Sequence, residues 1–133
     1  MIVVDSSAWI EFFRGTGSSA HRCLRQLLHG GAELAVTEVV VLEVLAGALS
    51  PRDVDQVRAR LHAFPVLPLR GLAGYEAAAG LFRTCRAAGE QIRRTTDCLV
   101  AVPTIEADAT LLHADRDFEI LARHTPLRLE PVT

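Results

Sequence analysis

The chain has 133 residues, and all 14 of its basic side chains are Arg, with no Lys. Against them stand 16 acidic residues, giving a formal net charge of −2 and an isoelectric point near 6.2. Without Lys the chain cannot be a Schiff-base enzyme, use a lysine general base or form a P-loop. A protein that held nucleic acid mainly through a basic surface would have a high isoelectric point, so any nucleic-acid function must rest on a local site.

This length predicts a single domain over residues 1–133, large enough to fold without disulfides or a structural metal. A mean hydropathy of +0.24 suggests an apolar surface that a partner covers. The three scattered cysteines are typical of buried thiols in a reducing cytosol. No apolar run approaches a membrane span, and the first residues lack the basic start of a signal peptide. We therefore expect a cytoplasmic protein with no membrane association.

Short apolar, β-branched runs predict a sheet of four to five strands, at Ile2–Val4, Leu34–Val36, Val66–Leu69, Thr110–His113 and, as a possible fifth, Leu127–Leu129. Helical spacing predicts helices between them, at Ala8–Phe13 (capped by Ser6 and Ser7), Ala20–Leu28, from Thr37 to about Leu49, Pro51–Phe64, Gly71–Ala88, Thr95–Ala107 and Arg116–Arg123. Alternation of strands and helices is typical of an α/β fold with a mostly parallel sheet and helices on both faces.

Four acidic residues are expected at one edge of this sheet. In open α/β sheets, ligands bind beyond the carboxyl ends of the strands. Asp5 follows the first strand, and Asp115 and Asp117 follow the fourth. The helix after Asp97 carries the chain about 15 Å away from this edge, and the strand leading to Asp115 returns it by about 16 Å. The alternative for Asp5 and Asp97 is that each only caps a helix.

Glu43 also fits a functional site. On a predicted helix its neighbours three and four residues away are all apolar: Val39, Val40, Ala46 and Gly47. A carboxylate among apolar neighbours is costly unless it is paired or binds a cation. The alternative is a salt bridge to an Arg.

Several acids at one sheet edge repel one another, so a positive charge must hold them together. Oxygen-only sites without His or Cys suit Mg²⁺ or Mn²⁺ rather than Zn²⁺. Mg²⁺ is usually bound by a few carboxylates together with substrate phosphates. The sequence therefore favours metal-dependent phosphoryl chemistry.

Taken together, these residues resemble the PIN-domain ribonucleases, and the length and layout resemble the VapC-type toxins of bacterial toxin–antitoxin pairs. The resemblance rests on a strand followed by Asp5-Ser6-Ser7, Glu43 in an apolar helix, Asp97 opening a helix, and the run from His113 to Phe118. It covers essentially the whole chain. It implies a PIN-like three-layer α/β sandwich and a Mg²⁺-dependent endoribonuclease, with Mn²⁺ able to substitute.

The resemblance also implies roles for individual residues. Asp5, Glu43, Asp97 and Asp115 match the catalytic quartet, and Asp5, Asp97, Asp115 and Asp117 the metal ligands. Ser7 matches a hydroxyl residue that orients the first Asp. Hydrolysis would leave a 5′-phosphate and a 3′-hydroxyl on an RNA, with tRNA and rRNA the expected substrates. A VapB-type antitoxin is expected to cover the site, and the toxin is expected to form a homodimer.

Four further residues lie near these acids in the sequence. His113 stands where the family more often has Thr or Ser, and it is a substrate contact, a proton carrier or a tolerated variant. Arg116 is assigned a supporting role, in which it neutralises the acids on either side of it. Arg93 and Arg94 either steer a phosphate or form an exposed basic turn. Pro103 is expected to kink its helix while leaving Asp97 in place.

Three other functions are alternatives for a sequence of this pattern. The first is a PIN-like nuclease of RNA maturation without an antitoxin, and the second is a non-catalytic binding module of the same fold. The third, a phospho-acceptor receiver domain, needs a Lys near its acids and is set aside. With the five site carboxylates excluded, the remaining 11 acids face 14 Arg, so the rest of the surface is mildly basic.

Overall fold

The structure, a computed structural model that describes residues 1–132, is built around a five-stranded sheet. Its strands are β1 (Ile2–Val4), β2 (Leu34–Thr37), β3 (Val66–Leu67), β4 (Thr110–Leu112) and β5 (Arg128–Leu129). They lie in the order β3-β2-β1-β4-β5, and every pairing is parallel. The predicted α/β fold is confirmed, and the sheet is wholly rather than mostly parallel.

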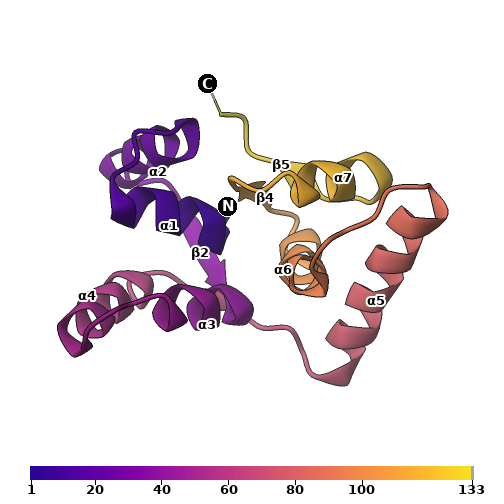
Figure 1. Cartoon of the computed structure of the whole chain (residues 1–133), viewed down its shortest axis with the longest axis horizontal. Coiled ribbons are helices and arrows are strands. Elements are labelled where there is room, and N and C mark those ends of the chain that lie inside the picture. Colours follow the sequence, from indigo (N-terminus) through magenta and orange to yellow (C-terminus); the bar gives the residue numbers. More distant parts are fainter. Residues whose placement is uncertain (133) are drawn as a thin grey trace.

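Seven helices flank the sheet within the described residues (Figure 1). They are α1 (Ser6–Arg14), α2 (Ser19–His29), α3 (Glu38–Ala46), α4 (Pro51–Leu61), α5 (Leu72–Ala87), α6 (Thr95–Glu106) and α7 (Asp117–His124). In Figure 1, α1, α2 and α4 lie to the left of the strands and α5, α6 and α7 to the right. No helix within residues 1–132 combines the length and apolar character that crossing a bilayer requires.

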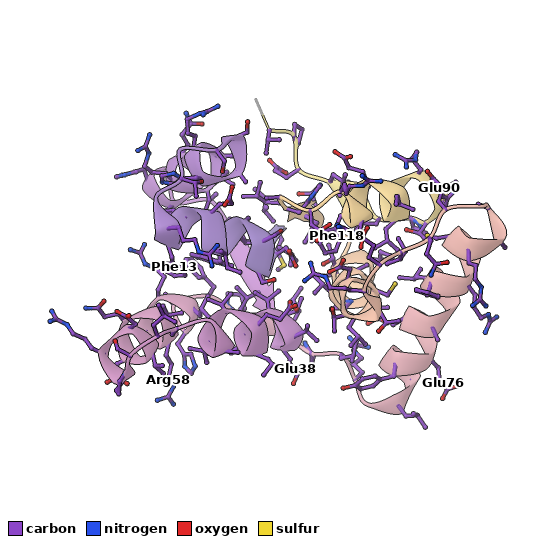
Figure 2. The ribbon with its side chains drawn as sticks, in the orientation of Figure 1. Phe13, Glu38, Arg58, Glu76, Glu90 and Phe118 are labelled. Atoms are coloured by element: carbon purple, nitrogen blue, oxygen red, sulfur yellow. The ribbon has the colours of Figure 1, made fainter. Side chains whose placement is uncertain are left out.

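The central strands are buried on both faces, as parallel strands covered by helices must be. Val3, Val4 and Val36 have no exposed surface. Phe118, also fully buried, lies on the inner side of α7 (Figure 2). In the register of β1 and β4, Val4 lies opposite Leu112. The next residue, Asp5, donates its backbone N–H to the carbonyl of Leu112 at 2.9 Å, which fixes it at the carboxyl edge of the sheet.

Several element boundaries differ from the predictions, including the end of α4 at Leu61 rather than Phe64, and three of the differences have a clear local reason. Asp5 is the N-cap of α1, so Ser6 and Ser7 lie inside the helix rather than capping it. Helix α3 ends at Ala46, and Leu49, predicted to be helical, is 95% exposed with no core to pack on. Strand β3 stops before Pro68, which has no N–H to donate to a sheet.

Helix α6 continues through Pro103 to Glu106. The proline ring removes one backbone hydrogen bond, and the helix remains continuous because seven of its residues are buried against the rest of the fold. Asp97 is one of those buried residues. Asp97 lies six residues before Pro103, in the first turn of α6.

Candidate metal and active site

Asp5 lies where β1 ends and α1 begins. Its Oδ2 accepts hydrogen bonds from the backbone N–H of Ser7 at 2.9 Å and from the Ser7 hydroxyl at 2.6 Å. Its Oδ1 is buried and has no hydrogen-bond partner among the described residues. Burial raises the pKa of Asp5 to about 6 against the lowering effect of the Ser7 hydrogen bonds, and the charge of Glu43 raises it further. Asp5 is thus a helix cap that keeps one oxygen available.

Asp97 occupies the first turn of α6 but does not cap it, because the N-cap position belongs to Arg94. The side chain is 3% exposed, and its Oδ2 has no hydrogen-bond partner within residues 1–132. Burial, followed by the charges of Asp5 and Asp115, raises the pKa of Asp97 to about 8. A buried carboxylate in this position is costly unless a cation compensates it.

Asp115 and Asp117 follow β4 and contact two arginines instead. Arg93 Nη2 donates to Asp115 Oδ1 at 2.9 Å, and Arg94 Nη2 donates to Asp115 Oδ2 at 2.6 Å. Arg93 donates both its backbone N–H and its Nε to Asp117, at 3.0 and 3.2 Å. The pKa of Asp115 lies below its usual value. Partial burial acts to raise this pKa, but the hydrogen bonds from the Asp117 N–H and from Arg94, together with the charges of both arginines, lower it by more.

These carboxylates converge as the sequence predicts. Asp97, Asp115 and Asp117 each offer an oxygen within 4.8 Å of the others, as a metal site requires. Asp5 lies outside that group at this distance, but its charge is the largest Coulombic contribution to the raised pKa of Asp97. The acids differ in their hydrogen-bond partners. Asp5 and Asp97, here called the Asp5–Asp97 pair, each keep an oxygen without a donor in the described chain, whereas Asp115 and Asp117, the Asp115–Asp117 pair, accept bonds from arginines.

Glu43 projects from α3 toward the start of α1. It is half-buried, and its Oε1 accepts a hydrogen bond from the Ser6 hydroxyl at 3.0 Å. Its negative charge acts on both Asp5 and Arg94. No ion pair between Glu43 and an Arg occurs in the described part of the chain, so the salt-bridge alternative is not supported.

Ser7 and His113 hold the loop that follows β4. The Ser7 hydroxyl, which donates to Asp5, also accepts the backbone N–H of Ala114 at 2.9 Å. His113 Nδ1 accepts the backbone N–H of Asp115 at 3.1 Å, and its ring packs on Phe118 with centroids 5.4 Å apart. Burial lowers the pKa of His113, in keeping with a neutral ring that accepts this bond. Its contacts are those of a residue that orients Asp115.

The structure, over the residues it describes, does not show Arg116 paired with the acids that flank it. Its side chain is exposed, and across residues 1–132 it makes no ion pair with the acids on either side. Arg93 and Arg94 make those pairs instead. Arg116 is the N-cap residue of α7, and its side chain makes no capping hydrogen bond among the described residues.

Sequence reasoning missed two features of the site. The ion pairs of Arg93 and Arg94 connect residues more than 20 positions apart, and only the placement of Asp97 at the same sheet edge hinted at them. The bond from Ser6 to Glu43 was also missed, because a serine beside a helix start indicates a cap rather than a partner 37 residues away.

The fold and the acid cluster are those of an α/β domain with a candidate metal site at the carboxyl edge of its sheet. Comparison with known families identifies the family. The PIN-domain profile matches residues 2–124. The chain is 39% identical over 129 residues to VapC ribonuclease Mb1587 of Mycobacterium bovis and to ribonuclease VapC11 of Mycobacterium tuberculosis, which covers 96% of this chain and 96% of each relative. The chain belongs to the PIN-domain family. The resemblance stated from the sequence is confirmed.

Solved structures support the fold at lower sequence identity. VapBC2 from Rickettsia felis, bound to a DNA fragment from its promoter, contains a chain that matches with a TM-score of 0.72 at 18% identity, over 98% of both chains. VapC20 of Mycobacterium tuberculosis, a sarcin–ricin loop cleaving toxin, matches with a TM-score of 0.68 at 15% identity, over 96% of this chain and 99% of the other. At these identities the likeness concerns the fold.

Proposed function

We propose that the protein is a divalent-metal-dependent endoribonuclease that acts as the toxin of a toxin–antitoxin pair. The observation that carries this proposal is a pair of buried carboxylate oxygens, Asp5 Oδ1 and Asp97 Oδ2, that no donor of the described chain satisfies. Buried polar groups in folded proteins are almost always hydrogen-bonded. Two such exceptions beside further carboxylates indicate a position built for a cation.

The residues present fit a hard divalent metal. The donors are all carboxylate oxygens, which suit Mg²⁺ or Mn²⁺. Asp97 would hold the ion together with Asp115 and Asp117, whose oxygens lie within 4.8 Å of its own, with the unbonded Oδ1 of Asp5 as a further ligand. A bound ion of this kind supplies an activated water and neutralises charge on the attacked phosphate. The identity of the metal as Mg²⁺ or Mn²⁺ is part of the proposal.

The chain's own residues then have separate tasks. Ser7 fixes Asp5 by two hydrogen bonds to Oδ2 and leaves Oδ1 free of a donor from the described chain. Ser6 holds one oxygen of Glu43 and leaves the other to take the proton of the attacking water. The water oxygen bonds to phosphorus as the bond to the 3′ oxygen breaks. The departing 3′ oxygen takes up a proton from solvent, and the products are a 5′-phosphate and a 3′-hydroxyl.

The relatives support the biological part of the proposal. Two curated relatives at 39% identity are named as VapC ribonucleases, and structural neighbours include a toxin–antitoxin complex from Klebsiella pneumoniae with a TM-score of 0.60. We therefore propose a VapB-type antitoxin as partner, a homodimer as the assembly, and tRNA or rRNA as the substrate. VapC20, described as cleaving the sarcin–ricin loop, makes a structured rRNA loop a good first substrate.

RNA cleavage by the purified protein tests the proposal. Cleavage is expected with Mg²⁺ or Mn²⁺, to stop with EDTA, and to be lost in Asp97→Asn. Asp55→Asn is a matched control, since Asp55 is an exposed carboxylate on α4. Cleavage at full rate by Asp97→Asn would contradict the site. A protein that binds no divalent ion would be a non-catalytic module, and cleavage without growth arrest on expression would favour RNA maturation.

A further inference from the structure

Two adjacent arginines meet the acid cluster in different ways. Arg93 is held at three points, by its backbone N–H and Nε on Asp117 and by Nη2 on Asp115. Because the backbone itself is bonded to a side chain that is 1% exposed, this residue fastens the segment before α6 to the loop after β4. Its guanidinium adds two bonds, to Asp115 and Asp117, so displacing it costs more contacts than displacing a guanidinium with a single bond.

The side chain of Arg94 makes one hydrogen bond within the described chain, from Nη2 to Asp115 Oδ2 at 2.6 Å. Its side chain is 57% exposed, so it can move into solvent without disturbing the core. Its positive charge acts on Asp97 and Glu43 as well as on Asp115. The guanidinium therefore lies among the carboxylates as a movable positive charge.

We propose that Arg94 exchanges places with the divalent metal: it compensates the carboxylates when no metal is bound, and it binds a phosphate of the RNA once the metal has displaced it. This rests on the proposed nuclease function. A divalent ion near Asp97 repels a guanidinium a few ångströms away. Asp115 Oδ2 would also interact less strongly with Arg94 if it bound the metal ion at the same time. A guanidinium freed at the rim finds a favourable partner in a phosphate, which it can bind through two parallel hydrogen bonds.

The exchange involves a buried carboxylate, Asp97, as well as the exposed ion pair between Arg94 and Asp115. Arg94 does not satisfy the orphaned Oδ2 of Asp97, so the arginine leaves that carboxylate accessible to a metal. Arg93 does not take part in the exchange, because its guanidinium bonds to both Asp115 and Asp117 rather than to one carboxylate. One arginine thus holds the site in shape, and the other responds to its occupancy.

Mn²⁺ binding to the RNA-free protein tests the first half of the exchange. By isothermal titration calorimetry, Arg94→Gln is expected to bind Mn²⁺ about tenfold more tightly than the unmodified chain, since the ion no longer breaks a charge-assisted hydrogen bond. Arg116→Gln removes the same charge from an exposed neighbour that makes no ion pair with the acids. Unchanged affinity in Arg94→Gln, or an equal increase in both variants, would overturn the exchange.

RNA binding tests the second half. With Mn²⁺ present, stopped-flow anisotropy on a labelled single-stranded RNA, read before cleavage, gives affinity as a function of salt. Arg94→Gln is expected to lower the slope of log affinity against log salt by about one, the effect of one lost phosphate contact. Arg94→Lys should restore most of the slope, and Arg83→Gln, at an exposed position on α5, should retain the slope of the unmodified chain. An unchanged slope in Arg94→Gln would overturn the phosphate contact.

These two readouts separate this inference from the proposed function. Thermal unfolding first confirms that each variant is folded. If the unmodified chain binds Mn²⁺ but cleaves no RNA, the nuclease proposal fails, while tighter Mn²⁺ binding by Arg94→Gln still supports the exchange. If RNA is cleaved and Arg94→Gln shows neither change, the nuclease proposal stands and the exchange is wrong.

Discussion

The Asp5–Asp97 pair and the Asp115–Asp117 pair occupy one site but are stabilised in opposite ways. Asp5 and Asp97 each keep a buried oxygen without a donor, and burial raises their pKa values to about 6 and about 8. Asp115 and Asp117 accept hydrogen bonds from Arg93, and Asp115 also from Arg94. The chain stabilises one half of its site by itself and leaves the other half dependent on a ligand.

Of the substitutions considered, Asp97→Asn is expected to have the largest effect on RNA cleavage. Removing a metal-binding carboxylate is expected to lower RNA cleavage at least about 100-fold, the scale on which active-site electrostatic groups act. Single-turnover cleavage at saturating Mg²⁺ measures the loss. Asp55→Asn, which changes an exposed carboxylate on α4, should leave the rate unchanged. Equal rates for Asp97→Asn and the unmodified chain would contradict any metal-binding role of the Asp5–Asp97 pair.

Removing the support of Asp5 is expected to have a smaller effect. Ser7→Ala deletes the hydroxyl that joins Asp5 Oδ2 to the Ala114 N–H. Loss of such an orienting partner lowers metal affinity or activity by about 10–100-fold. Ser7→Thr keeps the hydroxyl and should restore most of both. If Ser7→Ala bound Mn²⁺ as tightly as the unmodified chain, the hydroxyl would have no part in positioning Asp5.

Asp117→Asn tests the half of the site that the chain stabilises itself. The amide cannot accept the Nε and backbone N–H of Arg93 as a charged carboxylate does, so the segment before α6 loosens. We expect a loss of about 1–3 kcal/mol in the free energy of unfolding of the metal-free protein, measured by urea denaturation. An unchanged free energy of unfolding in Asp117→Asn would show that the bonds between Arg93 and Asp117 do not stabilise the segment before α6.

The metal-free protein is expected to lose stability as pH rises. Asp5 and Asp97 have higher pKa values folded than unfolded, so between about pH 4 and 8 the native state holds protons that the unfolded state has released. Stability therefore falls across this range, by at most about 1.4 kcal/mol per pH unit for each carboxyl. Denaturation at several pH values measures the slope, which should be smaller in Asp97→Asn and weakened by saturating Mg²⁺. A stability that rises from pH 6 to 8 would contradict the raised pKa values.

The fold was predictable because its signals are local. β-branched runs indicate the strands, helical spacing indicates the helices, and parallel connections follow from their alternation. The position of Asp97 followed from the rise per residue of helix and strand, since both quantities are fixed by backbone geometry. The ends of α3 and β3 were less predictable, because they depend on whether Leu49 finds a core and on how Pro68 interrupts the sheet.

The electrostatics of the site could not be predicted in the same way. Which arginine pairs with which acid depends on side-chain direction in loops, and spacing along the chain carries no information about that. Arg116, between two acids in sequence, looked like their partner, yet Arg93 and Arg94 hold that place from over 20 residues away. Orphaned oxygens on Asp5 and Asp97 likewise emerge only when the whole core is assembled around them.

The most direct test is the position of a metal ion in the protein. Anomalous diffraction from crystals grown with Mn²⁺ is expected to place an ion about 2.1 Å from Asp5 Oδ1 and Asp97 Oδ2, with Asp115 beside it and Arg93 still bonded to Asp117. An ion bound only by Asp115 and Asp117, with the two buried oxygens unliganded, or no ion at the sheet edge at millimolar Mn²⁺, would contradict the division of the site into these two halves.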